Sequence, residues 1–192
     1  MLENQIKITG LKILDESILI VFALITICIL GPIKLELSTS LPITSQSLLV
    51  VWFALAFGLR IGLTAVVLYL IAGGMGFGVF AGGASGWNQF IGSNGGFLLA
   101  FPIGAFLSGS LAKWALTKSI FSKAKFITSA LILIISQFVV LGLGIFWQSS
   151  MSPKSISIVE VIKTFMPELF ILTAIGTIVL VLVSRALSRI KS

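Results

Sequence analysis

Long apolar segments with almost no charge follow one another along this sequence, and they constrain its fold more than any other feature. A helix that crosses a membrane needs about 20 mostly apolar residues, with a range of about 17 to 25. We therefore predict an all-α integral membrane protein in which residues 1–192 form a single transmembrane domain. Its six predicted transmembrane helices are residues 17–33, 44–59, 61–76, 95–116, 126–147 and 166–187.

The second and third spans are the least clearly separated. Residues 48–80 form one apolar run that is interrupted by a single charge at Arg60, with Gly58 and Gly62 on either side of it. The run is too long for one ordinary span and short for two. We interpret it as two short spans that turn at Arg60, although hydropathy alone also allows five spans in total.

The composition excludes several classes of function. Only 10% of the residues are charged and 57% are hydrophobic, whereas a soluble domain carries about 25% charged residues. The chain has no histidine, no H-E-x-x-H segment and no G-x-x-x-x-G-K-[ST] segment. We therefore predict that it is not an enzyme and carries no cofactor. If nucleotide drives its activity, separate partner subunits hydrolyse the ATP.

Lysine and arginine orient the predicted spans. With six spans both termini lie on one side of the membrane, and ten of the 13 basic residues then share that side. These ten are Lys7, Lys12, Arg60, Lys113, Lys118, Lys123, Lys125, Arg185, Arg189 and Lys191. Basic residues accumulate on cytoplasmic loops, so we predict that both termini are cytoplasmic. The net charge of +7 then follows from topology, and no nucleic-acid partner is needed.

The segment Met75–Phe97 reads MGFGVFAGGASGWNQFIGSNGGF and lies on the predicted outer side, between the third and fourth spans. Its eight glycines permit sharp turns and close approach to a ligand. Amide side chains can both donate and accept hydrogen bonds. We interpret the segment as a glycine-rich external loop that presents Trp87, Asn88, Gln89 and Asn94 to a small polar ligand. A merely flexible external loop is the alternative.

Three motifs in order resemble a known family. They are LPITSQSLLV at 41–50, GLRIGLTAVVLYLIAGGMGFGVFAGG at 58–83 and GSNGGFLLAFPIGAFLSG at 92–109. Together they are similar to the biotin-specific substrate-capture (S) component of energy-coupling factor (ECF) transporters, the BioY family. Its first motif, P-[IV]-[TS]-x-Q-[TS], is matched by Pro42, Ile43, Thr44, Gln46 and Ser47.

The resemblance implies a function. Members of this family are six-helix proteins that bind biotin at the outer face of a bacterial or archaeal cytoplasmic membrane. They then dock on a transmembrane coupling subunit that two ATPase subunits drive. The expected partners are therefore biotin or a similar small vitamin, membrane lipid and these transporter subunits.

The last span departs from the family pattern P-F-[LI]-P-G-D-x-x-K, which supplies an acid and a lysine near the ligand. The segment here reads KTFMPELFILTA, in which Phe165 and Pro167 match and Glu168 is the nearby acid. An apolar residue stands at the lysine position, and Lys163 lies upstream. If the ligand is biotin, its ureido group then leaves Glu168 as the acceptor, and its carboxylate leaves Lys163, Lys154 or Lys34 as the cation.

The chemistry of biotin suits the remaining polar and aromatic residues. Its ureido ring needs paired hydrogen-bond donors and acceptors, its alkyl chain needs apolar walls, and its carboxylate needs a cation. The candidate substrate-binding residues are Gln46, Tyr69, Trp87, Asn88, Gln89, Asn94, Phe97, Lys163 and Glu168. The competing interpretation is that the aromatic residues and Lys163 anchor helix ends at the lipid headgroups.

Two other functions stay open on the sequence. One is a capture component for another small vitamin, because the family's lysine is missing from the last span. The other is a membrane scaffold that does not transport, in which stripes of small residues such as Gly58 and Gly62 serve only helix packing.

Overall fold

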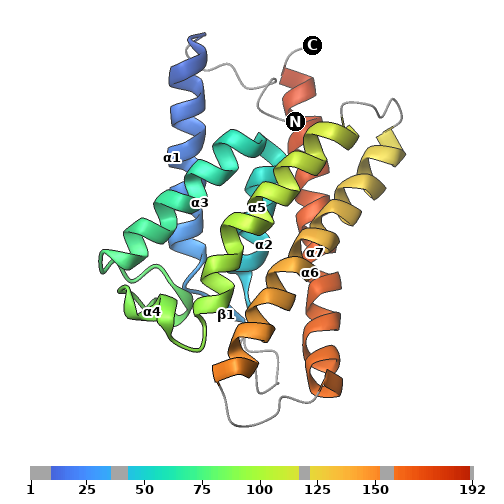
Figure 1. Cartoon of the computed structure of the whole chain (residues 1–192). Coiled ribbons are helices and arrows are strands. Elements are labelled where there is room, and N and C mark those ends of the chain that lie inside the picture. Colours follow the sequence, from blue (N-terminus) through green and yellow to red (C-terminus); the bar gives the residue numbers. More distant parts are fainter. Residues whose placement is uncertain (1–9, 36–42, 117–121, 152–157, 191–192) are drawn as a thin grey trace.

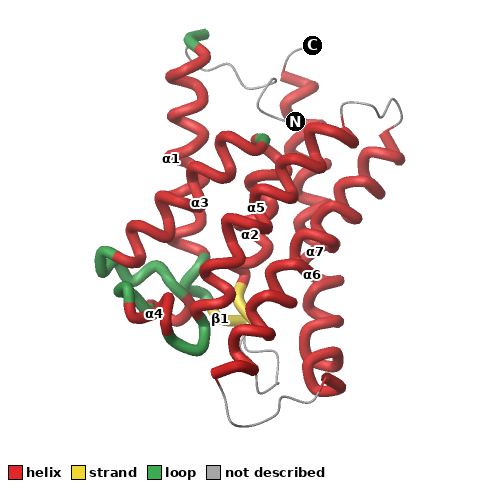
Figure 2. Tube along the Cα trace, in the orientation of Figure 1, coloured by secondary structure: helices red, strands yellow, loops and turns green. Residues whose placement is uncertain are grey.

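The structure, a computed structural model, describes residues 10–35, 43–116, 122–151 and 158–190. It is built almost entirely from helices (Figure 1; Figure 2). They are α1 (Lys12–Leu30), α2 (Ser45–Phe57), α3 (Leu59–Gly74), α4 (Asn88–Ile91), α5 (Gly95–Leu116), α6 (Ser122–Met151) and α7 (Ile158–Ile190). The helical fold class is as predicted. A 3-10 turn, η2 (Ala81–Gly83), and a two-residue antiparallel pairing of β1 (Lys34–Leu35) with β2 (Ile43–Thr44) were not predicted.

Four described helical stretches are long and apolar enough to cross a membrane. They are Lys12–Leu30, Gly95–Ala115, Phe126–Met151 and Leu169–Ala186. The other two apolar helices, α2 with 13 residues and α3 with 16, are shorter. A 13-residue helix rises only about 20 Å, against a hydrocarbon core of about 30 Å.

The short helix α2 lies at the centre of the assembly, where it contacts α1, α3, α5, α6 and α7. Ten of its 13 residues are buried, on every side of the helix. A helix that is apolar all round belongs inside a protein, because it has no polar face to turn outward. Two side-chain bonds fix it: Trp52 Nε1 donates to Gly176 O of α7 at 2.7 Å, and Ser108 Oγ of α5 donates to Val51 O at 2.7 Å.

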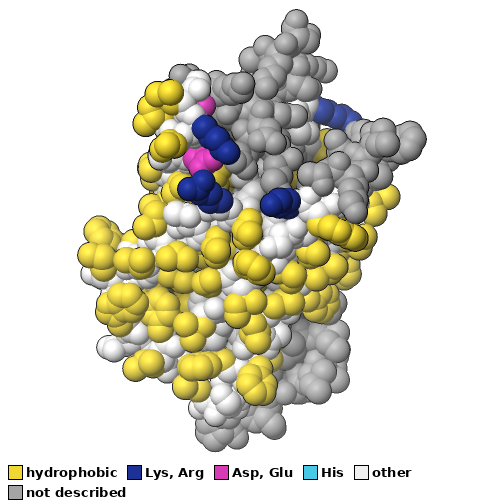
Figure 3. Space-filling model, turned by 45° about the horizontal axis from the view of Figure 1, so that its top comes forward, with side chains coloured by type: hydrophobic (Ala, Val, Ile, Leu, Met, Phe, Trp, Pro, Cys, Tyr) yellow, Lys and Arg dark blue, Asp and Glu magenta, His cyan; other side chains and the backbone are white. Residues whose placement is uncertain are grey.

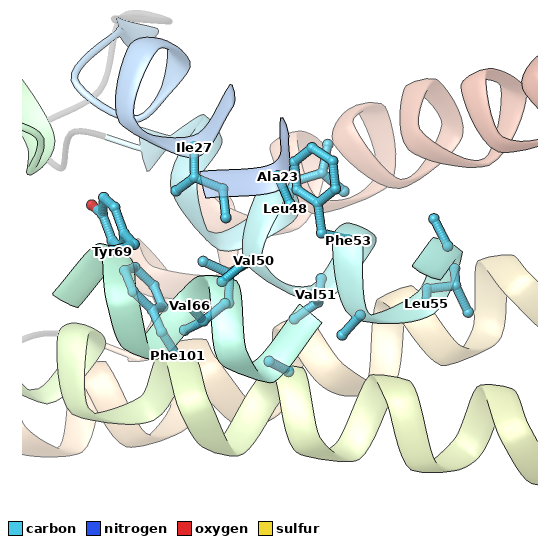
Figure 4. Packing of buried hydrophobic residues seen from close by; sticks show 14 of the residues in the cluster. Ala23, Ile27, Leu48, Val50, Val51, Phe53, Leu55, Val66, Tyr69 and Phe101 are labelled. Atoms are coloured by element: carbon cyan, nitrogen blue, oxygen red, sulfur yellow. The ribbon is translucent and has the colours of Figure 1, made fainter. Parts of the chain in front are cut away.

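Helix α1 packs through one narrow stripe. Its buried residues are Asp15, Leu19, Ala23 and Ile27, which recur every four positions. Ala23 and Ile27 face the residues of α2 and α3 that form the apolar core (Figure 4). Many of its other residues are apolar and exposed, among them Ile18, Val21, Phe22, Ile25 and Ile29, which suits contact with lipid acyl chains rather than water.

The predicted turn between the second and third spans is present. Gly58 separates α2 from α3 and has a φ of +90°, a backbone conformation that favours glycine. One turn later, Gly62 lies against α2 so closely that an added Cβ would stand 2.6 Å from Ala54 N. The two helices therefore form a tight hairpin whose close approach requires glycine.

Charged side chains gather at one end of the assembly. The start of α1 and the end of α7 lie at this end, whereas α4 and β1 lie at the other (Figure 1). Figure 3 shows the described Lys and Arg side chains at the first end, next to a broad band of hydrophobic side chains. There, Glu16 Oε1 of α1 lies 3.7 Å from Lys12 Nζ, and Glu16 Oε2 lies 3.4 Å from Arg60 Nη1 of α3.

Candidate functional site

The glycine-rich loop that follows α3 is packed against the helices rather than extended away from them. Gly82 N donates to Pro32 O at 3.0 Å, and Gly86 N donates to Gly73 O at 2.7 Å. Gly82 and Gly83 have φ values of +70° and +76°, which side chains with a Cβ rarely adopt. The loop thus follows a defined path over the end of the assembly at which α4 and β1 lie.

Two predicted site residues lie directly beneath this loop and contact each other. Gln46 is the second residue of α2 and is 3% exposed, and Tyr69 of α3 is 0% exposed. Gln46 Nε2 donates a hydrogen bond to Tyr69 Oη, and Tyr69 Oη donates to Val79 O of the loop at 3.1 Å. Gln46 Nε2 also lies 3.4 Å from Val79 O. The polar atoms of both side chains therefore face one loop carbonyl.

A row of aromatic rings continues from this pair into the loop. Phe80 is 2% exposed and lies edge-on to Tyr69, with ring centroids 5.6 Å apart. On its other side Phe90 also meets it edge-on, at 5.8 Å. Phe80 lies directly over Gly73, where any side chain would collide with the ring. This burial explains why a loop so rich in aromatic residues stays folded.

The loop residues predicted to face a ligand lie at the surface. Trp87 is 59% exposed, and its ring lies over Gly74, where an added Cβ would be 2.9 Å from the ring atoms. Asn88 and Asn94 are exposed, and Gln89 is half-buried. Because Gly74 follows Gly73 by about 100° around α3, Trp87 and Phe80 cover different sides of that helix. Trp87 joins the row of rings through Phe90, with centroids 5.3 Å apart, so Trp87 lies at the exposed end of the row and Tyr69 at its buried end.

The far end of the loop is tied to α6. Trp147 Nε1 donates to Gly92 O at 3.0 Å, and the Trp147 ring lies against Gly96. The predicted residue Phe97, at the start of α5, is half-buried and faces Gly144 of α6. Sequence reasoning did not identify Trp147 as a loop contact, because nothing in an isolated span indicates which segment its indole will meet.

Two further predicted residues, Lys163 and Glu168, occur in α7, but their side chains lie outside the described residues, as does that of Lys154. Their role toward a ligand stays a prediction. The loop itself carries no charge, and the Lys and Arg side chains that the structure describes lie at the opposite end. Lys34 of β1 lies at the loop end, but its side chain is outside the described residues. Among the described side chains, the site is thus uncharged.

A buried polar pair between α6 and α7 was not anticipated. Gln137 Nε2 donates to Thr173 Oγ1 at 3.0 Å, and both side chains are buried. An amide within a long apolar segment is the signal that could have indicated it, since such groups are costly in lipid and usually pair between helices.

Comparison with known proteins identifies relatives. The model of the BioY family matches residues 4–191. Over 121 residues the chain is 35% identical to the biotin transporter BioY2 of Lactococcus lactis subsp. cremoris. This match covers 63% of this chain and 62% of that protein. Over 68 residues it is 37% identical to the probable biotin transporter BioY of Pyrococcus horikoshii, which covers 35% of this chain and 42% of that protein. Both matches span less than two thirds of the relative's length.

The fold is also known from a solved structure. The crystal structure of the S-component for biotin from an ECF-type ABC transporter superposes with a TM-score of 0.76. The superposition covers 93% of this chain and 95% of the other, at 22% sequence identity. The arrangement of helices is therefore that of an S-component.

Proposed function

The chain belongs to the BioY family, and from this premise we propose that it binds biotin and takes part in its uptake as the substrate-specific S component of an ECF-type transporter. The observation that carries the proposal is the family match over almost the whole chain, residues 4–191. Relatives described as biotin transporters support it. The family consists of transporter components, so no catalytic step is assigned to this chain.

The chain is a multi-pass membrane protein, and residues 1–192 form one transmembrane domain that crosses the cytoplasmic membrane of a bacterium or archaeon six times. The four long apolar helices account for four crossings. The hairpin of α2 and α3 supplies two more, because a short helix is tolerated at membrane depth when protein covers it. Both termini are cytoplasmic, and the basic end supports this orientation.

Ligand capture takes place at the opposite, external end, beneath or beside the glycine-rich loop. Amides of Asn88, Gln89 and Asn94 serve the ureido ring of biotin, and Trp87 offers an aromatic surface. The predicted outer side offers Lys34, Lys154 and Lys163 as cations for the carboxylate. Lys163, which is closest in sequence to Glu168, supplies the charge, and Glu168 accepts a ureido N–H.

Energy for transport comes from other chains. A transmembrane coupling subunit and two ATPase subunits complete the transporter, and ATP is hydrolysed on the latter. The exposed apolar side chains of the outer helices contact membrane lipid and, at one face, the coupling subunit.

A ligand panel on the purified, full-length chain tests the function. Biotin, its uncharged amide, riboflavin and thiamine are titrated separately by calorimetry in detergent. Biotin alone should bind tightly. Tight binding of another vitamin would favour the second candidate, which the missing lysine of the last span supports. Absence of binding by every vitamin would favour a membrane scaffold and contradict the proposal.

A further inference from the structure

Four segments of the chain converge on one buried point. Gly31 at the end of α1, Gln46 of α2, Tyr69 of α3 and Val79 of the loop meet there, and we call this point the loop junction. An added Cβ on Gly31 would lie 3.2 Å from both Gln46 Cγ and Val79 O, so the backbone of α1 closes the junction on one side. Tyr69 Oη and Gln46 Nε2 close it on the other.

From this geometry we infer that Gln46 and Tyr69 are positioning residues for ligand capture. They hold the glycine-rich loop at Val79 and so fix the residues that follow, and they do not themselves touch the ligand. The inference rests on the proposed function in its reference to biotin, whereas the anchoring of the loop can be measured without any ligand.

The hydrogen bonds that Gln46 and Tyr69 already make argue against a direct contact between either side chain and a ligand. The Tyr69 hydroxyl donates to Val79 O and accepts from Gln46 Nε2, so its donor is already used. Tyr69 is 0% exposed. A ligand that reached this hydroxyl would have to displace the loop and break the bond from Tyr69 Oη to Val79 O, which costs free energy.

The loop needs such an anchor because its own sequence specifies little. Gly76, Gly82, Gly83 and Gly86 all have positive φ, and glycine loses more conformational freedom on ordering than any other residue. Two buried donors on Val79 O supply an external constraint in the first half of the loop. Phe80, the next residue, enters the gap above Gly73, so the polar and apolar anchors are adjacent.

The constraint at Val79 extends to the predicted ligand residues. Gly86 N donates to Gly73 O, and Gly86 immediately precedes Trp87 and α4. Without the bonds at Val79, the segment between Val79 and Gly86 would be held mainly by Phe80 and by the bond from Gly82 N to Pro32 O. A shift of this segment would pass through Gly86 to Asn88 and Gln89. A loosened loop should therefore let ligand escape faster.

The test uses Tyr69→Phe, which keeps the ring against Phe80 and removes only the hydroxyl, and Gln46→Met, which keeps the side-chain length. Hydrogen exchange of the loop is measured first in the ligand-free, full-length protein, in peptides that include Gly82 and Gly86. We then measure the biotin dissociation rate of each protein and the ratio of its affinities for biotin and biotin amide.

The matched control is Gln137→Met. It removes a bond of the same kind, a buried amide donating to the Thr173 hydroxyl at 3.0 Å, between α6 and α7 and away from the loop. It reports what the loss of a buried amide does to the protein in general, without any change at the loop junction.

We expect both junction variants to increase loop exchange and biotin dissociation by roughly two- to tenfold, the range that corresponds to one net hydrogen bond. The preference for biotin over its amide should stay as in the wild type, and Gln137→Met should leave loop exchange unchanged. The inference would be overturned if the loop of Tyr69→Phe exchanged hydrogen at the wild-type rate. It would also be overturned if a junction variant changed the preference for biotin over its amide. If the wild type binds no biotin but the junction variants still exchange faster, the anchor stands and the proposed function fails.

Discussion

Trp147 of α6 donates its indole N–H to the carbonyl oxygen of Gly92 across 3.0 Å. This bond joins the end of the glycine-rich loop to a residue of α6 that lies 55 positions later in the sequence. The loop is therefore held at both of its ends, by the loop junction near Val79 and by Trp147 near Gly92. Between these points lies α4, with Asn88 and Gln89.

Trp147→Phe should loosen the second half of the loop, because it removes the indole donor and leaves Gly92 O with only the local bond from Gly95 N. We expect biotin binding to weaken by about 0.5–1.5 kcal/mol, the usual net value of one hydrogen bond. Trp52→Phe is the control, since it breaks a similar indole bond to Gly176 O between α2 and α7. Both variants should lower the thermal midpoint, and equal effects of the two on biotin affinity would contradict the assignment.

Asn88→Ala and Gln89→Ala should each weaken biotin binding by about 1–3 kcal/mol, the cost of leaving a buried partner group unsatisfied. Calorimetry on folded protein provides the measurement. Ser93→Ala, in the same loop and also exposed, should bind as the wild type does. If both amide variants retain full affinity, the loop surface is not the ligand site.

Gly62→Ala should destabilise the fold by about 1–3 kcal/mol, because the new methyl group would collide with the backbone at Ala54 and push α3 away from α2. Gly142→Ala on α6 is the matched control, since an added Cβ there meets no atom within 4 Å. Alanine also favours a helix over glycine, so this variant should be as stable as the wild type or slightly more stable. Thermal unfolding in detergent compares them, and equal losses would refute the close packing of the hairpin.

Lys163→Gln should abolish the preference of the protein for biotin over its uncharged amide, because an ion in a partly dry site needs an opposite charge. Affinities for both ligands are compared in the wild type and the variant. Lys154→Gln serves as the control and should keep the preference. The reverse pattern would assign the cation to Lys154, and a preference kept by both variants would assign it to Lys34. No preference in any of the proteins would leave the carboxylate in water.

A thiol reagent added outside the cell should label the cysteine introduced by Ser93→Cys but not the one introduced by Lys113→Cys. Both variants are made in a Cys28→Ala background. Both positions are exposed, and the uneven distribution of lysine and arginine puts them on opposite sides of the membrane. A membrane-impermeant maleimide on intact cells measures this. Labelling of Lys113→Cys alone would invert the orientation and put the loop on the wrong side for capture.

The sequence alone was enough to predict a helical membrane protein and the segments in which its long helices lie, because apolar periodicity and length reflect local demands of a lipid environment. The three motifs were enough to indicate the BioY family. The turn between α2 and α3 was also predictable, since Gly58 and the charge of Arg60 interrupt an otherwise continuous apolar run.

Only the tertiary structure decided what the candidate residues contact. Gln46, Tyr69, Trp87 and Asn88 all looked like ligand residues, yet the first two meet each other and Val79 beneath the loop, while the last two lie on its surface. The physical reason is that a glycine-rich segment has no periodicity and little conformational preference of its own. Its path depends on donors and rings from α2, α3 and α6, and that packing is set by contacts distant in sequence.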